Sequence, residues 1–423
     1  MTTNPHPSTS RVRRVLVDHS GYELANLGDT AMLVSGLDRM LRLWPDAEFM
    51  VITHAPQRLA VLYPGVRAVD PEPWLAGPLD GRPAVAVEQL SRLVWPFRRD
   101  GRGFPATGPV PLPVALSHAD VVVSTGGGFV NSAWPRHSLG VLHLLGQAQR
   151  RGVPTAMFGQ GLGPMTMRRS RIANAVVGAT ISHRARRVLP HLGALGLRET
   201  VNGPATASAL GADYTVTGDD ALEIAVTGTV STGRRVGLNV RQSGYGGAIN
   251  ARGLGRGLTA AFERSDGIVA VPISTYDDGE DMRAIDAALR EMGIDPVDDD
   301  VVMQTPSTPR DLSALVADCN LMVTLSYHAG VFALAQGVPV LGLAPGPYYR
   351  ARYQGLAALF GDDACRVIDM SQRGWERHMA ESARTAQEMS LARREEILAV
   401  AVDQRERGRA LYRSFADSIA QRR

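Results

Sequence analysis

From residue 11 onward, short apolar segments rich in β-branched residues alternate with longer segments in which apolar residues recur at helical spacing. VRRVLVDHS predicts a first strand, GYELANLGD a glycine-containing loop, and TAMLVSGLDRMLRLWP an amphipathic helix. Three more strands are predicted at AEFMVIT, ADVVVSTGG and VPTAMFGQG, the last two of which end in glycines. This order is typical of βα units that form a parallel sheet buried on both faces.

A second series of strands, with helices between them, begins near residue 235 at RRVGLNVRQ and continues with DGIVAVPIS, NLMVTLSYH and VPVLGLAPG. The segment TGTVSTG before it has the composition of a linker. We therefore expect an α/β fold with two Rossmann-like domains facing a cleft, at residues 11–230 and 235–380. A disordered tail is expected at 1–10 and a charged helical segment, which contributes packing and no chemistry, at 381–423. Residues 71–113 are rich in Pro, Gly and Arg with little periodicity, which predicts a long surface loop.

Composition narrows the classes of function. The chain has 423 residues with 45 basic and 42 acidic side chains, a net charge of +3 with no basic stripe, which argues against a nucleic-acid partner. It contains no lysine, which excludes a Schiff-base enzyme that uses its own lysine and a Walker A phosphate loop. Its fixed cations are arginines, which bind phosphate and carboxylate groups through paired hydrogen bonds.

Two cysteines are too few for a disulfide framework or a cysteine-rich zinc site. No stretch approaches the roughly 20 apolar residues of a membrane-spanning helix, and the first apolar run is too short for a signal peptide. We expect a cytoplasmic protein with no membrane span and no metal site. The sequence leaves its oligomeric state open.

The first candidate site residues lie where the first strand passes into the first helix. Asn26, Gly28 and Asp29 stand at a helix N-terminus, where free backbone N–H groups favour an anion. Gly28 allows close approach to the backbone. The alternative is structural, since Asp29 is also a suitable N-cap residue for this helix.

Two glycine-rich strand ends follow. Gly126, Gly127 and Gly128 form a plausible floor for a ligand, and Gln160 adds an amide that both donates and accepts. Consecutive glycine-rich strand ends predict one shared crevice. The pattern is not GxGxxG, so a dinucleotide site is not indicated, and a tight turn without a ligand is the alternative at the triple glycine.

Single charged residues extend the candidate site. Arg198 lies near a predicted strand end, although a lone arginine is more often in a surface ion pair. Asp219 precedes another aspartate and is either a cap or a binding group. Arg241 follows the first strand of the second domain and is placed to reach an anion from the opposite wall of the cleft.

The segment TLSYHAGVFALAQGVP carries the candidate catalytic residue, His328, which we expect in the first turn of a helix after a strand. The positive helix end disfavours its protonation, which suits a proton shuttle or a donor to an oxyanion. The alternative is a core histidine with a backbone partner. Ser326 and Tyr327 precede it. Downstream, Arg350 and Arg352 offer cations beside aromatic rings, although a solvated helix face has the same composition.

Taken in order, NLGD, TGGG, GQGLGP, LRET, GDDA, NVR and SYHAGVFALAQGVPVLGLA resemble the polysaccharide pyruvyl transferase family over residues 14–360. The resemblance implies a two-domain fold similar to GT-B glycosyltransferases. It also implies transfer of a pyruvyl group from phosphoenolpyruvate to hydroxyls of a sugar or glycan acceptor, as a ketal. Phosphoenolpyruvate is then a co-substrate, and no cofactor is expected.

The chain departs from the family pattern beside His328. Family members typically carry an arginine two residues before this histidine, where this chain has Ser326. Either Arg241, Arg350 or Arg352 replaces the missing guanidinium, or this branch uses a different donor or acceptor. In the implied mechanism His328 is the acid/base, arginines and glycine-loop amides hold the donor, and residues of the first domain, Asn26, Asp29 and Gln160, orient the acceptor.

Two other functions stay open at this stage. A GT-B-type glycosyltransferase with a nucleotide-sugar donor would use the same glycine loops and arginines. A non-catalytic relative that binds a carbohydrate or another partner would retain the fold without the donor site. Neither the acceptor nor its determinants can be read from the sequence.

Overall fold

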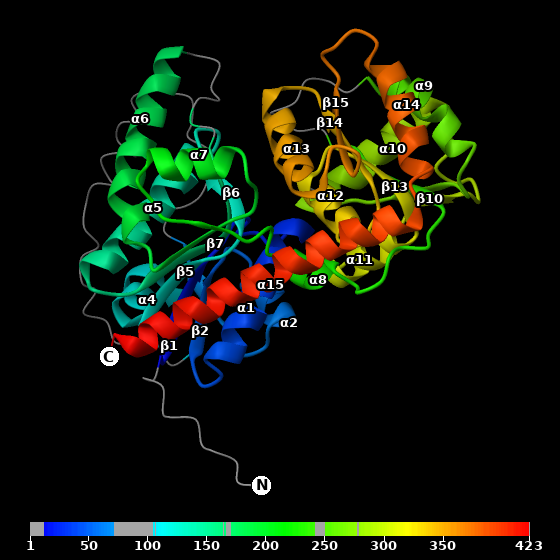
Figure 1. Ribbon diagram of the computed structural model, residues 1–423. Coiled ribbons are helices and arrows are strands. Elements are labelled where there is room, and N and C mark those ends of the chain that lie inside the picture. Colours follow the sequence, from blue (N-terminus) through cyan, green and yellow to red (C-terminus); the bar gives the residue numbers. More distant parts are fainter. Residues whose placement is uncertain are drawn as a thin grey trace.

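The computed structural model describes residues 12–71, 105, 107–163, 165, 171–241, 250–276 and 279–422 (Figure 1). The expected tail at 1–10 and most of the expected loop at 71–113 lie outside these residues. None of the described helices is both long enough and apolar enough to cross a membrane.

The N-terminal domain is built on a parallel sheet of nine strands among the described residues, in the order β4-β3-β2-β1-β5-β7-β8-β9, with β6 paired to β7. Its strands are β1 (Arg14–Asp18), β2 (Glu48–Ile52), β3 (Arg67–Asp70), β4 (Val110–Pro111), β5 (Val121–Ser124), β6 (Gly127–Val130), β7 (Thr155–Leu162), β8 (Ala194–Leu197) and β9 (Thr215–Val216). Its helices are α1 (Leu27–Leu43), α2 (Pro56–Leu62), α4 (Leu112–His118), α5 (Pro135–Arg150), α6 (Arg171–Val188), the 3-10 helix η1 (Leu189–His191), α7 (Asn202–Ala209) and α8 (Leu222–Ala225).

Both faces of this sheet are buried, because alternate residues of each strand point to opposite sides. In β1, Leu16 joins the core on the side of α5, whereas Val15 and Val17 join the core on the side of α1. The continuous apolar runs that predicted buried parallel strands are therefore explained by helices on both sides.

The C-terminal domain repeats this design with a six-stranded parallel sheet, in the order β12-β11-β10-β13-β14-β15. This is the Rossmann order, with the first strand of the domain in the middle of the sheet. Its strands are β10 (Arg235–Asn239), β11 (Ile268–Ala270), β12 (Val301–Val302), β13 (Cys319–Thr324), β14 (Val340–Ala344) and β15 (Cys365–Asp369). Its helices are α9 (Ala251–Phe262), α10 (Glu280–Met292), α11 (Pro309–Ala317), α12 (Tyr327–Leu334), α13 (Pro347–Phe360) and α14 (Trp375–Gln387). The boundary expected at residue 381 falls inside α14, because this helix packs as one piece against α9.

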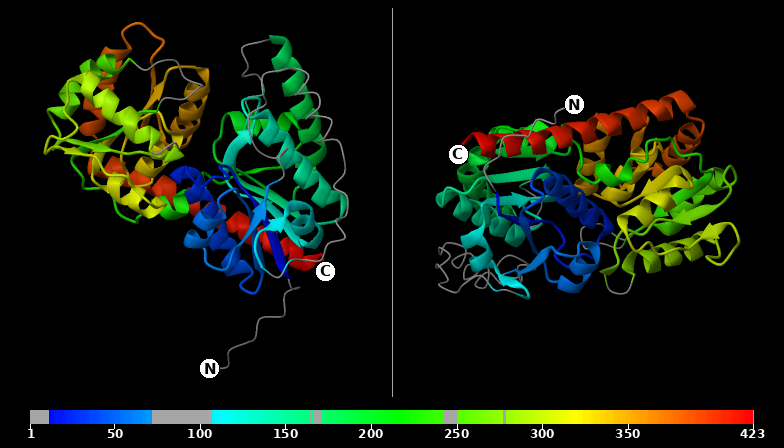
Figure 2. Two further views of the ribbon diagram at one scale, coloured as in Figure 1. Left: turned by 180° about the vertical axis from the view of Figure 1, so that it is seen from behind. Right: turned by 90° about the horizontal axis from the view of Figure 1, so that it is seen from below.

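The last helix, α15 (Leu391–Gln421), crosses from the C-terminal domain back to the N-terminal domain, as Figures 1 and 2 show. Its Tyr412, Phe415 and Ile419 belong to the apolar core on the α1 side of the first sheet. The Tyr412 ring stacks on Phe158 of β7 with centroids 3.6 Å apart. The charged helical segment at the end of the chain therefore holds the two domains together.

A buried ion network strengthens this junction. Arg39 of α1 is 3% exposed and pairs with Asp220 at 2.5 Å and with Glu223 at 3.0 Å. Tyr412 donates a hydrogen bond to Asp220 at 3.0 Å, and Arg409 of α15 also pairs with Glu223. The network ties α1, the segment around α8 and α15 to one another.

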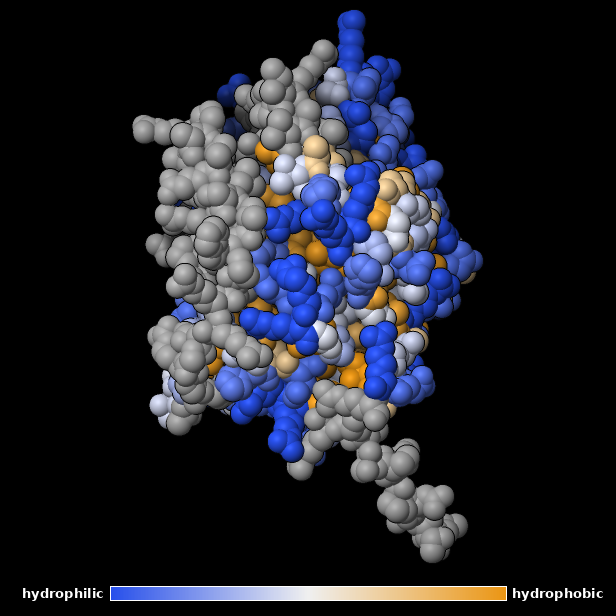
Figure 3. All heavy atoms as spheres, turned by 90° about the vertical axis from the view of Figure 1, so that its left-hand side faces the viewer, coloured by the Kyte–Doolittle hydropathy of each residue, from blue (hydrophilic) through white to orange (hydrophobic). Residues whose placement is uncertain are grey.

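The domains also meet directly at the start of α1. Leu27 N–H donates to the Ile273 carbonyl at 2.8 Å, and Thr275 N–H donates to the Ala25 carbonyl at 2.7 Å. Leu27, Ala31 and Met32 of α1 lie in the apolar core of the C-terminal domain. The amino end of α1 is thus fixed against the second domain. On the coloured part of the face in Figure 3, hydrophilic residues are interspersed with apolar patches.

Candidate active site

A cavity of about 670 Å³ lies between the two domains. Residues from the carboxyl ends of strands in both sheets, and from the first turns of the helices that follow, line it. In open α/β sheets this is the edge where ligands bind. Nine of the residues singled out from the sequence line it: Asn26, Asp29, Gly128, Arg198, Arg241, Ser326, Tyr327, His328 and Arg352.

Arg198, the residue after β8, is the most buried cation of the cavity, with 3% exposure. Its guanidinium carbon lies 4.2 Å from the centre of the Tyr327 ring, and its Nη1 is 3.5 Å from Asp219 Oδ2. A Cβ at Gly128 would lie 2.6 Å from Arg198 Nη2, so only glycine leaves room for this side chain. One aromatic and one acidic neighbour thus hold a buried positive charge, and the alternative of a surface ion pair is wrong.

Two more arginines reach the same cavity. The guanidinium carbon of Arg352, on α13, lies 4.5 Å from the centre of the Tyr348 ring. Arg352 also lies against Gly128, where a Cβ would be 2.8 Å from its Nη2. Arg241 follows β10, and its Nε is 3.8 Å from Oδ1 of the buried Asp281. Arg350 does not take part: it pairs with Asp369 at 2.6 Å and does not line the cavity. The reason is helical geometry, because residues two positions apart on α13 face different sides.

His328 lies in the first turn of α12, as the sequence predicts, and is 7% exposed. Burial lowers its pKa well below the usual value, and Arg198, Arg352 and Arg241 lower it further. The imidazole is therefore neutral at neutral pH. Its Nε2 lies 3.8 Å from Asp219 Oδ2, which is too far for a hydrogen bond. Because the ring is neutral, the two side chains do not form an ion pair.

Asp219 lies directly behind His328 and is itself buried. Burial raises its pKa to about 6, with Arg198 acting in the opposite direction. Its Oδ1 accepts a hydrogen bond from the Ala221 N–H at 2.9 Å. A carboxylate at this distance is suited to stabilise the protonated form of the imidazole through its charge.

At the opposite wall, Asn26 is the N-cap of α1 and accepts from the N–H groups of Gly28 and Asp29. The alternative of Asp29 as the N-cap is thus wrong, and its carboxylate is available to the cavity. Burial raises the pKa of Asp29, whereas the Ser20 hydrogen bond and the three arginines lower it. Gly28 packs on His328: a Cβ there would lie 2.1 Å from the imidazole Cγ.

A family model described as polysaccharide pyruvyl transferase matches residues 26–347 of the chain. The matched segment begins at the N-cap of α1 and ends after β14. It contains eight of the nine predicted residues that line the cavity, and Arg352 lies beyond it. The chain belongs to the polysaccharide pyruvyl transferase family. Membership indicates a transferase enzyme. A search of curated proteins finds no match.

Solved structures similar to this family member share its fold at low sequence identity. A putative UDP-N-acetylglucosamine 2-epimerase from Listeria monocytogenes has a TM-score of 0.55 at 12% identity, covering 92% of this chain and 91% of that chain. The glycotransferase of kitacinnamycin has a TM-score of 0.55 at 15% identity, covering 98% and 99%. The calicheamicin glycosyltransferase CalG4 has a TM-score of 0.53 at 12% identity, with the same coverage. The predicted GT-B-like pair of Rossmann-like domains is confirmed.

Besides Arg350, and besides Gly28 and Asp219 next to His328, three expected binding residues of this pyruvyl transferase family member do not line the cavity. A Cβ at Gly126 would lie 2.4 Å from the Met32 sulfur, and one at Gly127 would lie 2.3 Å from the Phe129 ring. These two glycines thus allow close packing of α1 and of a neighbouring ring. The amide of Gln160 is buried and donates to the carbonyls of Thr125 and Phe158, at 2.7 and 3.0 Å. Only Gly128 of the triple glycine forms the expected floor.

Sequence reasoning found Tyr327 but missed several other aromatic residues of the cavity. Tyr22, Phe129, Trp134 and His137 line it from the N-terminal domain and Tyr276 from the C-terminal domain. They stand in loops or at helix starts, where no periodic pattern marks them. Only Phe129 had a signal in the sequence, because it directly follows the glycine-rich strand end.

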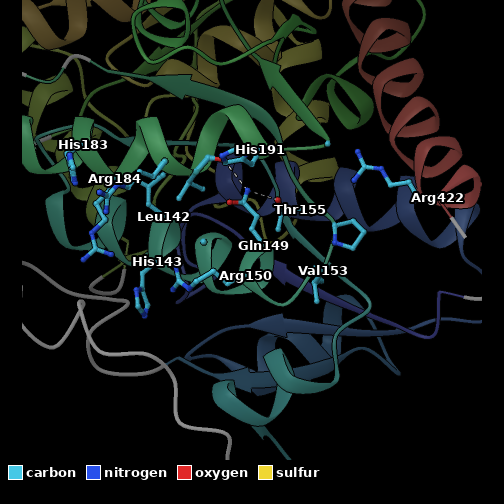
Figure 4. Close-up of a pocket in the computed structure, with 16 residues that line it drawn as sticks. Leu142, His143, Gln149, Arg150, Val153, Thr155, His183, Arg184, His191 and Arg422 are labelled. Carbon is cyan, nitrogen blue, oxygen red and sulfur yellow. Dashed lines mark hydrogen bonds between the residues drawn. The ribbon is translucent and has the colours of Figure 1, made fainter.

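A second hollow of about 940 Å³ lies on the N-terminal domain (Figure 4). It is lined by the carboxyl ends of α5 and α6 and the amino ends of β7 and β8, on the edge of the sheet opposite the interdomain cavity. Gln149 crosses it, donating to Thr155 Oγ1 and the Val188 carbonyl, each at 3.0 Å. Its cations include Arg150, Arg187 and Arg422, which stand at helix carboxyl ends, where they complement the helix dipoles. These charges are explained by helix stability.

Within the described residues no group of three His, Cys, Asp or Glu side chains could hold a metal ion.

Proposed function

We propose that this protein transfers the pyruvyl group of phosphoenolpyruvate to two hydroxyls of a sugar acceptor and releases inorganic phosphate. The vinyl carbon C3 gains a proton and becomes a methyl group. Two C–O bonds form at C2, and the bond from C2 to the phosphate oxygen breaks. Two protons leave the acceptor hydroxyls. The proton added to C3 balances one of them, and the other leaves with inorganic phosphate.

The observation that carries this proposal is the convergence of Arg198, Arg241 and Arg352 on one cavity beside a neutral histidine. Phosphoenolpyruvate presents a phosphate and a carboxylate on a three-carbon frame. Guanidinium groups bind both anions with paired hydrogen bonds. Arg352 and Arg198 lie against the Tyr327 ring and supply the positive charge that Ser326 lacks.

His328 is the residue that we assign to proton transfer at C3. In the free protein, burial and three nearby positive charges keep its pKa low. A bound trianionic donor offsets these charges, so the pKa of His328 rises and the imidazole takes up a proton. Asp219 stabilises the imidazolium from behind. Delivery of this proton to C3 leaves a cationic C2, which the arginine-held carboxylate stabilises.

Asp29 and Asn26 face this centre from the first domain. Asp29 is placed to orient an acceptor hydroxyl and to accept its proton as that oxygen attacks C2. No cofactor takes part in the proposed reaction. A cytoplasmic location stays a prediction.

Similarity to glycosyltransferases and epimerases gives a second candidate, a nucleotide-sugar transferase, because the same fold serves it. Thermal unfolding with each donor separates the two. At a ligand concentration of 100 Kd, binding stabilises a fold by about 2.7 kcal/mol, enough to raise the midpoint measurably. We expect phosphoenolpyruvate to raise it and UDP-glucose to leave it unchanged.

Arg352→Gln and Arg350→Gln form a matched pair for this test. Both remove one guanidinium from α13, but only Arg352 lines the cavity. Loss of a charged hydrogen-bond partner costs about 1.5–3 kcal/mol, so Arg352→Gln weakens phosphoenolpyruvate binding by about 10- to 150-fold. Arg350→Gln keeps the affinity of the wild type. Stabilisation by UDP-glucose alone, or equal effects of both substitutions, contradicts the proposal.

A further inference from the structure

One half of the cavity lining, contributed mostly by the N-terminal domain, is aromatic. Tyr22 stacks on His137 with ring centroids 5.1 Å apart, and His137 lies 4.4 Å from Phe129. His54 extends this series on the other side of Tyr22, at 5.9 Å. Trp134, which is 41% exposed, also lines the cavity. These rings form a continuous wall on the N-terminal domain.

Carboxylates share this half of the cavity. Glu23 and Glu280 line it together with Asp29, and Tyr276 stands between the domains near Glu23 and Asp29. Burial raises the pKa of Tyr276 and the negative charges of Asp29 and Glu23 raise it further, whereas Arg241 and Arg58 lower it. Within the described part of the chain, neither Glu23 nor Glu280 forms an ion pair. Their charges therefore act on whatever enters the cavity.

We propose that this half, formed by Tyr22, Phe129, Trp134, His137 and Tyr276 with Glu23 and Glu280, receives an uncharged sugar ring and rejects acceptors that carry a phosphate or carboxylate within the cavity. The assignment rests on the proposed function, because it places the donor on the arginines and the acceptor on the aromatic side chains.

Two physical effects give this selectivity. The apolar face of a sugar ring packs on flat aromatic side chains, which offer a large contact area at a low cost in side-chain entropy. An anionic substituent meets two carboxylates that no cation of the described residues pairs. Like-charge contact of this kind lowers the affinity of the wrong ligand without adding any contact to the right one.

The test compares two acceptors that differ in charge, methyl glucoside and glucose 1-phosphate, on the His328→Gln variant at saturating phosphoenolpyruvate, so that the reaction consumes neither acceptor. Binding to the full-length protein is measured by saturation-transfer NMR. Occupation of the arginines by the donor prevents them from attracting the sugar phosphate. We expect methyl glucoside to bind about tenfold or more tightly than glucose 1-phosphate.

The variant Glu23→Gln/Glu280→Gln removes both charges without changing side-chain size. We expect it to reduce the ratio of the two affinities, methyl glucoside over glucose 1-phosphate, to about two. Glu291→Gln is the matched control, since Glu291 is exposed on the same helix as Glu280 and does not line the cavity. Trp134→Ala lowers the affinity for both sugars, whereas Trp134→Phe, which keeps an aromatic ring, retains most of it. Binding of neither sugar, equal binding of both, or a ratio that is unchanged in the double variant overturns the inference. Failure of phosphoenolpyruvate to stabilise the protein would instead contradict the proposed function.

Discussion

Replacement of Gly28 by alanine tests the contact between the two domains at the catalytic histidine. A Cβ at this position would lie 2.1 Å from His328 Cγ and 2.2 Å from Nδ1. Non-bonded carbon atoms rest about 3.5–4.0 Å apart, so the imidazole or the helix must move by about 1.5 Å. Gly28 lies within α1 and has no left-handed backbone conformation, so the added methyl group acts through this contact alone.

Such overpacking costs about 1–3 kcal/mol of folding stability, and the unfolding midpoint falls by a few degrees. The substitution also affects the reaction. Displacing a proton-transfer group by about 1 Å lowers the rate roughly 100-fold. We therefore expect Gly28→Ala to fold, to bind phosphoenolpyruvate, and to lose about 99% of its phosphate release with an acceptor.

Gly330→Ala is the matched control, because it adds the same methyl group to α12, where the nearest atom would lie at 3.5 Å. It should keep the activity of the wild type. The double variant Gly28→Ala/His328→Ala should recover the lost stability, since the clashing ring is gone, but no activity. Full activity in Gly28→Ala, or no recovery of stability in the double variant, would refute this account of the contact.

Three further predictions follow from the buried charges. Binding of phosphoenolpyruvate takes up about one proton at pH 7.5, measured by calorimetry in buffers of different ionisation enthalpy, and His328→Gln abolishes this uptake because it removes the group whose pKa rises. Burial lowers the pKa of His19 to about 4 from 6.5, so below pH 6.5 the unfolded chain binds a proton at this residue that the folded chain does not. In urea unfolding between pH 6.5 and 4, stability should therefore fall less steeply in His19→Asn than in the wild type, by about 1.4 kcal/mol per pH unit, and equal slopes would contradict this role of His19. Arg39→Leu leaves buried carboxylates without their partner and should cost about 3–5 kcal/mol, whereas Asp266→Asn, which breaks an exposed pair with Arg234, should cost less than about 1 kcal/mol; a similar loss in both would contradict the role of the network.

Local patterns predicted the parts of the fold that depend on local sequence. The strand at Arg235–Asn239 and the start of a helix beside His328 follow from apolar periodicity, and both lie where the sequence places them. The position of Arg241 after its strand follows from the same reasoning. These predictions succeed because hydrophobic periodicity directly reflects burial in strands and helices.

The parts that failed depend on contacts between distant residues. Gly126 and Gln160 stand at the expected strand ends, but Met32 packs on the first and two carbonyls accept from the second. The difference between Arg350 and Arg352 depends on the direction of α13, which only packing sets. The aromatic wall of the cavity is formed by loops that converge after folding, so no periodicity along the chain marks it.

Mass spectrometry of a sugar acceptor incubated with the protein and phosphoenolpyruvate tests the central claim most directly. The account predicts a pyruvyl ketal, recognised by its fixed mass increment, formed in equal amount with free phosphate and absent in His328→Gln. In D₂O its methyl group should carry one deuterium from the proton added at C3. A product that forms only from a nucleotide sugar, or a pyruvyl product that His328→Gln makes at the rate of the wild type, would contradict it.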